Sequence, residues 1–172
     1  MAKRTISCTL SEKSLRQAMG QLKQYQERLD NRNKIFVTRL AQLGIPIVHE
    51  NVTMAQGDSD KPYNTYIRVV SLKGYSEAKL VLQGRQVSFI EFGAGVHYNG
   101  AAGSSPHPKG GNLGYTIGSY GAGHGADDYW YYVDDSGVSH RSYGTKATMP
   151  LYKASVYMRR KIRRIAKEVF GG

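Results

Sequence analysis

Hydrophobic residues in the first third of the chain recur with the period of a helix. They lie three or four residues apart and draw one apolar stripe along a segment that is otherwise polar and basic: Leu15, Ala18, Leu22, Tyr25 and Leu29. The pattern slips over residues 30–33 and resumes over residues 36–43, which indicates either one kinked helix or two successive helices. The stripe is expected to pack on a sheet, and its alternative use is as a coiled-coil surface for a partner.

The sequence also marks where this helical region begins and ends. Thr9 and Glu12 form the T-x-x-E pattern of a capping box, in which two side chains satisfy backbone N–H groups at the start of a helix. Gly44, followed two residues later by Pro46, predicts the end of the helix, because glycine favours the position after a helix and proline resists continuation.

The middle of the chain predicts strands. Residues 63–72 and 78–83 are rich in β-branched and aromatic side chains, and a short turn joins them. A tight connection over residues 83–85 leads to a third expected strand over residues 87–92, whose successive side chains alternate between two faces. An antiparallel meander of three strands is the economical arrangement.

Beyond the third predicted strand the composition changes. Gly93 and Gly95 permit a sharp turn, because glycine takes positive φ at little cost. They open a long Gly-rich loop over residues 93–127, in which eleven of the first 33 residues are glycine. The aromatic sequence of residues 128–133 predicts a fourth short strand, and a turn over residues 134–137 ends it.

The last part of the chain predicts a second amphipathic helix, beginning near Pro150. Its apolar positions are three or four residues apart, and its other faces are strongly basic. The apolar positions are Leu151, Ala154, Met158, Ile162, Ile165 and Val169. The expected fold class is α+β: an N-terminal helix or helix pair and a C-terminal helix, packed on a small antiparallel sheet of three to four strands, in a single domain over residues 1–172.

The net charge of +11 at pH 7 is concentrated at the two ends of the chain. Residues 1–56 hold nine basic and four acidic side chains, and residues 151–172 hold seven and one. That distribution suits contact with nucleic acid, an acidic membrane or an acidic protein surface. The single cysteine, Cys8, excludes an intrachain disulfide framework and a cysteine-based zinc site.

No apolar run approaches the roughly 18 residues that a membrane-spanning helix needs. The first ten residues, MAKRTISCTL, lack the apolar centre of a secretory signal. We therefore expect no membrane partner, and a protein that is made and used in a cytoplasm or exported only within a larger assembly.

Motifs for catalysis or cofactor binding are weak. The glycines at 121, 123 and 125 lack the preceding strand and following helix of a phosphate-binding loop. No two histidines have the i, i+4 spacing that presents two nitrogens to one metal; the five are His49, His97, His107, His124 and His140. Three of them lie in or beside the Gly-rich loop, where solvated side chains are expected. The aspartate pairs at 127–128 and 134–135 suit turns better than acid–base catalysis. We expect no enzymatic activity, cofactor, metal or small-molecule substrate.

Three groups of residues are candidate contact sites. Glu91 shares one face of the third predicted strand with Phe89, and a buried carboxylate there needs a partner, either a basic residue of the C-terminal helix or a neighbouring subunit. A subunit interface is expected at Phe89, Glu91 and Phe92 and at the aromatic cluster Tyr129, Trp130, Tyr131 and Tyr132. Contact with DNA or an acidic partner is expected at Arg159, Arg160, Arg163 and Arg164.

Four phrases follow one another along nearly the whole chain. They are the helix LRQAMGQLKQYQERLDNRNKIFVTRLAQLG, the phrase VSFIEFGAGV, the Gly-rich loop ending in YWYYV, and the closing TKATMPLYKASVYMRRKIRRI. Within them, Phe89–Gly95 follows two expected strands, and Thr145–Ala154 has the form T-x-x-x-x-P-L/F-x-x-A that opens a last helix. In these phrases the chain resembles the neck, head–tail joining and tail-completion proteins of tailed bacteriophages.

The resemblance implies a non-enzymatic virion protein. Copies would form a homo-oligomeric ring, expected to be six-fold, at the head–tail junction. The ring would join the capsid connector to the tail tube or its terminator protein, and double-stranded DNA would pass through its lumen. The resemblance also implies assembly in the cytoplasm of the bacterial host.

Two alternatives remain open from the residues themselves. One is a basic nucleic-acid-binding protein that uses the arginine-rich C-terminal helix. The other is a metal-dependent hydrolase that uses the aspartates and the histidines of the loop.

Overall fold

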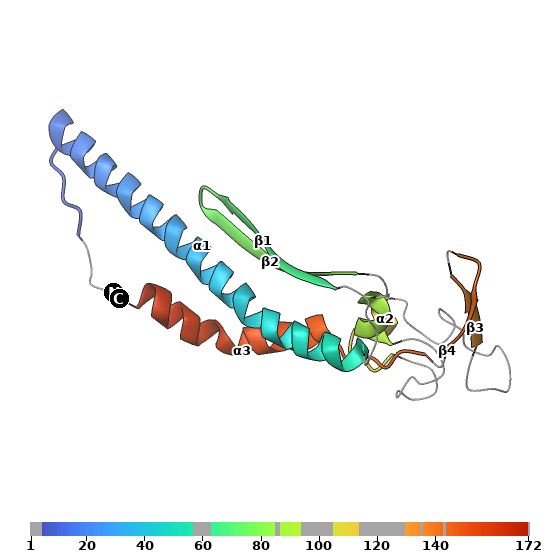
Figure 1. Ribbon diagram of the computed structural model, residues 1–172. Helices are drawn as coiled ribbons and strands as arrows, with labels where there is room; N and C mark the ends of the chain where they lie inside the picture. The colour runs from blue at the N-terminus through green and yellow to red at the C-terminus, as the bar shows by residue number, and fades with distance from the viewer. Residues whose placement is uncertain are drawn as a thin grey trace. The chain divides into compact units, whose positions relative to one another are not determined.

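The computed structural model describes residues 5–56, 63–84, 87–93, 105–113, 130–134, 136–142 and 144–171. Its elements, in chain order, are α1 (Glu12–Gln56), β1 (Asn64–Leu72), β2 (Tyr75–Gln83), α2 (Val87–Phe92), the short 3-10 helix η2 (Gly111–Leu113), β3 (Trp130–Val133), β4 (Ser139–Ser142) and α3 (Pro150–Phe170) (Figure 1). This confirms the α+β class, with long N- and C-terminal helices and antiparallel strands between them.

The chain divides into two compact units. Residues 1–44, 66–81 and 157–172 form the first, and residues 45–65 and 82–156 form the second. The boundary between them falls inside α1, β1, β2 and α3. The expectation of a single domain over residues 1–172 stays a prediction. No helix within the described ranges is long and apolar enough to cross a membrane.

Helix α1 begins at Glu12, and its cap differs from the predicted capping box. The hydroxyl of Ser11 accepts the N–H of Ser14 at 3.3 Å, so Ser11 is the capping residue. Thr9 lies outside the helix, and its N–H donates to the hydroxyl of Ser14 at 2.9 Å. The serine that follows Leu10 thus takes the role that the sequence pattern assigned to Thr9.

Helix α1 continues through Gly44 and Pro46 to Gln56, so the predicted stop is wrong. The alternative of two successive helices is also wrong, because residues 30–33 are helical within α1. An internal proline costs a helix about 3 kcal/mol. The turns after Pro46 bury Val48 and Val52, at 0% and 6% exposure. Each buried valine contributes roughly 1.5–3 kcal/mol, which is enough to offset the proline.

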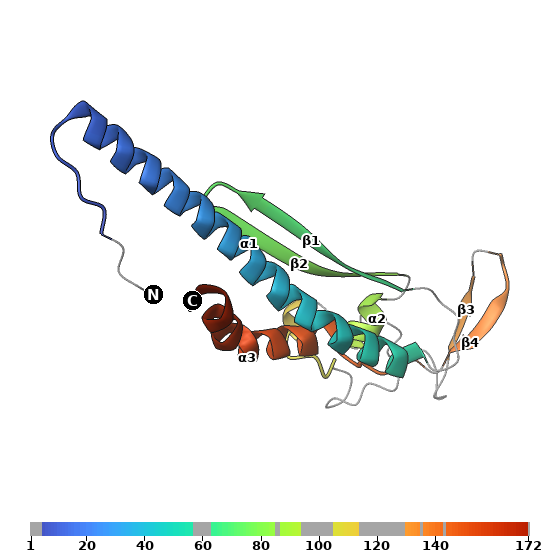
Figure 2. The same cartoon turned by 60° about the vertical axis from the view of Figure 1, so that its left-hand side comes forward.

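In the first unit, the hairpin of β1 and β2 lies alongside α1, as both views show (Figures 1 and 2). The carboxylate of Asp30 in α1 accepts the N–H of Gly74 in the hairpin turn at 3.2 Å. Gly74 has a φ of +73°, a conformation that glycine adopts without strain. This bond connects the middle of α1 to the tip of the hairpin.

The C-terminal half of α3 also packs on α1 within the first unit. The ring centroids of Phe36 and Phe170 lie 5.7 Å apart, and Nη1 of Arg39 lies 4.0 Å from Oε2 of Glu168. Ile165 is only 4% exposed. The predicted apolar face of α3 is thus confirmed at Ile165, as it is in the second unit at Ala154, which is fully buried. Ile162 is 42% exposed and does not belong to the buried face.

The third predicted strand is wrong, because Val87–Phe92 forms the short helix α2. The N–H of Gly93 donates to the carbonyl of Phe89 at 2.7 Å, and Gly93 has a φ of +85°, as expected for a glycine that ends a helix. In the described part of the chain, β1 pairs only with β2, and β3 only with β4, so the three-stranded meander is also wrong. Gly95 lies outside the described residues.

The second hairpin confirms one predicted strand and adds another. Strand β3 lies within the predicted range 128–133, and it pairs antiparallel with β4, which the sequence analysis did not predict. Asp134 closes the turn: its carboxylate accepts the N–H groups of Ser136 and Val138, each at 2.9 Å. The expectation that this aspartate makes local turn hydrogen bonds is confirmed.

Candidate functional site

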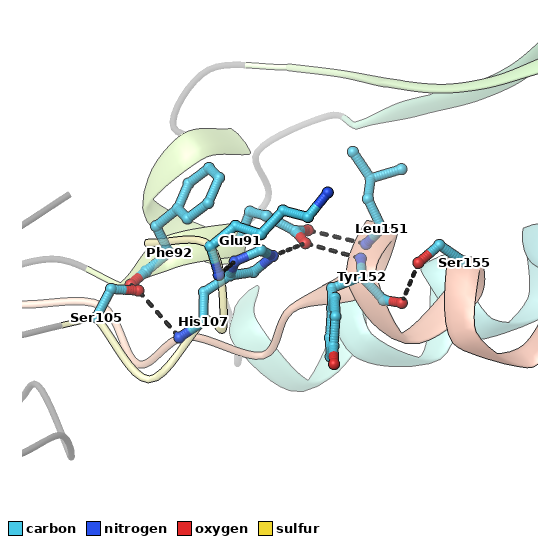
Figure 3. Close-up of polar contacts among 8 residues, drawn as sticks. Glu91, Phe92, Ser105, His107, Leu151, Tyr152 and Ser155 are labelled. Carbon is cyan, nitrogen blue, oxygen red and sulfur yellow. Dashed lines mark hydrogen bonds and ion pairs between the residues drawn. The ribbon is translucent and has the colours of Figure 1, made fainter. Parts of the chain in front are cut away.

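The start of α3 is held by a carboxylate from α2. The first N–H groups of a helix have no partner inside the helix, and they carry the positive end of its dipole. Glu91 accepts two of them: its Oε2 accepts from Leu151 and its Oε1 from Tyr152, both at 2.8 Å. Glu91 is only 5% exposed. Its charge is therefore buried against donors that match it, as Figure 3 shows.

His107, from the segment 105–113, lies against the same carboxylate. Its Nε2 is 3.3 Å from Oε1 of Glu91, and its Nδ1 accepts the N–H of Lys109 at 3.0 Å. Because Nδ1 accepts, the proton of the neutral ring is on Nε2, where it faces the carboxylate. We call Glu91, His107, Leu151 and Tyr152 the Glu91 cluster.

Two aromatic rings pack against His107. The ring of His107 lies 4.6 Å from that of Phe92 and 5.1 Å from that of Tyr152, measured between centroids. His107 is only 7% exposed. The expectation that a histidine of the Gly-rich loop is solvated is therefore wrong for His107.

Hydrogen bonds hold the loop segment in place. The hydroxyl of Ser105 donates to the carbonyl of Phe92 and accepts the N–H of His107 at 3.2 Å. Gly110 packs so closely that an added Cβ would lie 2.6 Å from the Cβ of Ser105. Only glycine fits at this position without moving Ser105, whose hydroxyl holds the backbone of His107.

A second set of polar contacts joins the end of α1 to the residues that lead into α3. Asn51 is only 4% exposed. Its backbone carbonyl accepts a hydrogen bond from the hydroxyl of Thr148 at 2.7 Å, and its side-chain oxygen accepts one from the ammonium of Lys153 at 2.6 Å. The carbonyl of Ile90 accepts the N–H groups of Thr148 at 2.9 Å and Met149 at 3.3 Å. Both α1 and α2 therefore contact the first turn of α3.

The chemistry of the Glu91 cluster is that of a structural site. Ser105, His107 and Glu91 have the side-chain types of a serine hydrolase triad, whose serine needs an imidazole nitrogen that takes its proton. Here Nδ1 of His107 already accepts a backbone N–H, and Nε2 faces the carboxylate. The serine hydroxyl donates to a backbone carbonyl. No ring nitrogen of His107 is left to act as the base for Ser105.

The partners of Glu91 come from the C-terminal helix, but they are not the basic side chains that the sequence analysis expected. The sequence analysis expected a basic side chain of the C-terminal helix or a neighbouring subunit. The C-terminal helix does supply partners, but they are backbone N–H groups of Leu151 and Tyr152 instead of a lysine or arginine. The interface role of Phe89, Glu91 and Phe92 stays a prediction.

The aromatic cluster and the arginines are placed only in part. Tyr131, on β3, is 63% exposed. Tyr129 and the side chains of Trp130 and Tyr132 lie outside the described residues. All four predicted arginines are exposed: Arg159, Arg160, Arg163 and Arg164. Arg164 lies 3.5 Å from Glu168.

The alternative of a metal-dependent hydrolase depended on aspartates and histidines. Across the described ranges, no group of three or more His, Cys, Asp or Glu residues is arranged to hold a metal ion. His140 bonds Asp134 across the second hairpin, with its Nε2 2.8 Å from Oδ2. This bond, together with the N–H groups of Val138 and Ser136, lowers the pKa of Asp134 below its ordinary value.

Sequence reasoning missed Asn51, Ser105 and His107 as partners in this site. Asn51 lies beyond the predicted end of α1, so it was not considered as a helical residue. His107 was expected to be solvated because it lies in the Gly-rich loop. The signal that was present is the pair of phrases Phe89–Gly95 and Thr145–Ala154, whose residues meet at Glu91 and the first turn of α3.

No family model, curated protein or solved structure matches this chain.

Proposed function

We propose that this protein is a structural subunit of a homo-oligomeric ring at the head–tail junction of a tailed phage or a phage-tail-like particle. The ring joins the capsid connector to the tail tube or its terminator, and DNA passes through its lumen. It assembles in the cytoplasm of the bacterial host. Support comes from the resemblance in the sequence and from the surface of α1.

The observation that carries the proposal is a row of exposed apolar side chains on one face of α1. Leu15, Met19, Leu22 and Tyr25, which we call the exposed stripe, are 43%, 69%, 55% and 50% exposed. Their spacing of three or four residues places them along one face of the helix. In the stripe predicted from the sequence, Ala18 is buried, but Leu15, Leu22 and Tyr25 are exposed, so their expected packing on the chain's own sheet is wrong. A contiguous apolar surface of this kind is typical of a subunit whose neighbours cover it.

The use of the buried polar groups also supports a structural role. The two phrases that carry the resemblance form one joint, in which Glu91 caps α3 and Ile90 bonds the residues before it. The two groups in this joint with acid–base chemistry, the carboxylate of Glu91 and the imidazole of His107, are both engaged in contacts that hold the fold.

The test measures the mass of the purified protein in solution by light scattering, and electron microscopy images the oligomers that it forms. We expect a concentration-dependent, closed oligomer several times heavier than the 19.1 kDa chain. A charge within the exposed stripe, in Leu22→Glu, should reduce the oligomer to a monomer while the helical circular dichroism persists. Gln24→Glu adds the same charge on the opposite face of α1 and should leave the oligomer intact.

The proposal fails if the unmodified chain stays monomeric at every concentration tested. It also fails if the two glutamate variants weaken the oligomer equally, because the stripe would then have no special part in assembly.

A further inference from the structure

One exposed face of α3 in the first unit carries five basic residues, and that face contains no acidic residue. These residues, which we call the basic face, are Arg159, Arg160, Arg163, Arg164 and Lys167. All five are exposed. At 100° and 1.5 Å per residue they cover an arc of about 140° and a length of about 12 Å along the helix. The basic face is therefore a compact surface.

The opposite face of α3 packs on the protein at Ile165, which is buried. Near the end of the helix, the rings of Phe36 and Phe170 are also in contact. Glu168, the only acidic residue of α3, is engaged by Arg39 and Arg164 beside the basic face. Among the described residues, Arg159, Arg160 and Arg163 form no ion pair. Their positive charge therefore remains available to an anionic partner.

The type of basic residue indicates what that partner is. Four of the five are arginine, whose planar guanidinium binds phosphate oxygens with two parallel hydrogen bonds. A face that served only solubility would suit a mixture of basic and acidic side chains. We infer that the basic face of α3 binds the phosphate backbone of duplex DNA, without regard to base sequence. This goes beyond the proposed ring and does not depend on it.

The size of the basic face sets the expected salt dependence. Duplex DNA carries one negative charge per about 1.7 Å of its axis, so about 12 Å carries roughly seven phosphates, about half of them on one side. Three or four phosphate contacts give a slope of about −3 in log affinity against log salt. Affinity should therefore fall about 40- to 150-fold between 50 and 200 mM salt.

The experiment measures binding of the full chain to a labelled DNA duplex of about 30 base pairs by fluorescence anisotropy, across that salt range. The test variant replaces Arg159, Arg160, Arg163 and Lys167 with glutamine. Glutamine keeps helix propensity, and the paired Arg164 is left unchanged. The control variant replaces four exposed lysines elsewhere in the first unit with glutamine: Lys13, Lys23, Lys34 and Lys73. Both variants lose four positive charges.

We expect the test variant to bind at least tenfold more weakly and to lose most of the salt slope, while the control changes by less than threefold. Equal weakening in both variants overturns the inference, because net charge alone would then explain binding. A polyglutamate competitor tests the other source of negative charge. If it displaces DNA at equal charge concentration, the face recognises acidic protein surfaces and the inference is wrong. The oligomeric state is measured separately, so failure here leaves the proposed ring standing.

Discussion

Replacing Glu91 with glutamine tests whether the carboxylate holds the start of α3. Glutamine has the same shape, but it offers one acceptor oxygen where glutamate offers two. If that oxygen occupies the Oε1 position, it still accepts from Tyr152 and His107. The amide NH₂ then faces the N–H of Leu151, so two donors oppose each other where a 2.8 Å bond now stands.

The expected cost follows from the groups that lose their partners. A hydrogen bond to a charged group is worth about 1.5–3 kcal/mol, and a buried donor without a partner costs about 1–3 kcal/mol. The two values describe the same contact and are not added, so we expect Glu91→Gln to lower the free energy of unfolding by about 1.5–3 kcal/mol. Glu50, exposed on α1 in the same unit, provides the control. Glu50→Gln should change stability by less than about 0.5 kcal/mol.

Guanidinium denaturation followed by circular dichroism measures the difference, and amide hydrogen exchange locates it. The N–H groups of Leu151 and Tyr152 should exchange faster in Glu91→Gln than in the unmodified chain. If Glu91→Gln is as stable as Glu50→Gln and these two amides exchange at unchanged rates, the carboxylate does not cap α3 in solution. The structural account of the site would then be refuted.

Two further predictions concern the loops of the second unit. Gly110→Ala should lower stability by about 1–3 kcal/mol, because its Cβ would lie 2.6 Å from the Cβ of Ser105, whereas Gly111→Ala, with open space around it, should be neutral in the same denaturation assay. Equal stability of the two variants would contradict the tight packing at Gly110. The pKa of Asp134 is lowered in the fold, chiefly by its bond to His140, so its contribution to the second hairpin is complete above about pH 4 and is lost as the pH falls through the lowered pKa. NMR should show the N–H of Val138 losing protection in that acid range, and Asp134→Asn should remove the transition; a transition that persists in the variant would assign it to another group.

Much of the fold was predictable from the sequence, because the long helices have strong periodicity. The local signals failed where tertiary contacts override them. Pro46 normally ends a helix, but burial of Val48 and Val52 carries α1 past it. A six-residue alternation at Val87–Phe92 fits a strand or a short helix. The choice between strand and helix depends on hydrogen bonds from residues around the start of α3 to Ile90 and Glu91. Those residues are about 60 positions away in the sequence, so a local sequence pattern does not include them.

The site was predictable only as far as a buried charge requires a partner. The sequence identified Glu91 as a carboxylate that needs one, but the partners it receives are backbone N–H groups, which every residue except proline carries. Sequence composition cannot distinguish one N–H from another. His107 was hidden for a different reason: its segment is poor in apolar residues, and its burial depends on the ring contacts of Phe92 and Tyr152.

The Glu91 cluster joins segments that are far apart in the sequence. Glu91 lies at the end of α2, two residues before the first glycine of the Gly-rich loop, and His107 comes from the segment 105–113. Both side chains lie at the start of α3. This arrangement explains why a phrase at Phe89–Gly95 and a phrase at Thr145–Ala154 belong together: one supplies the carboxylate, and the other supplies the helix end that the carboxylate caps.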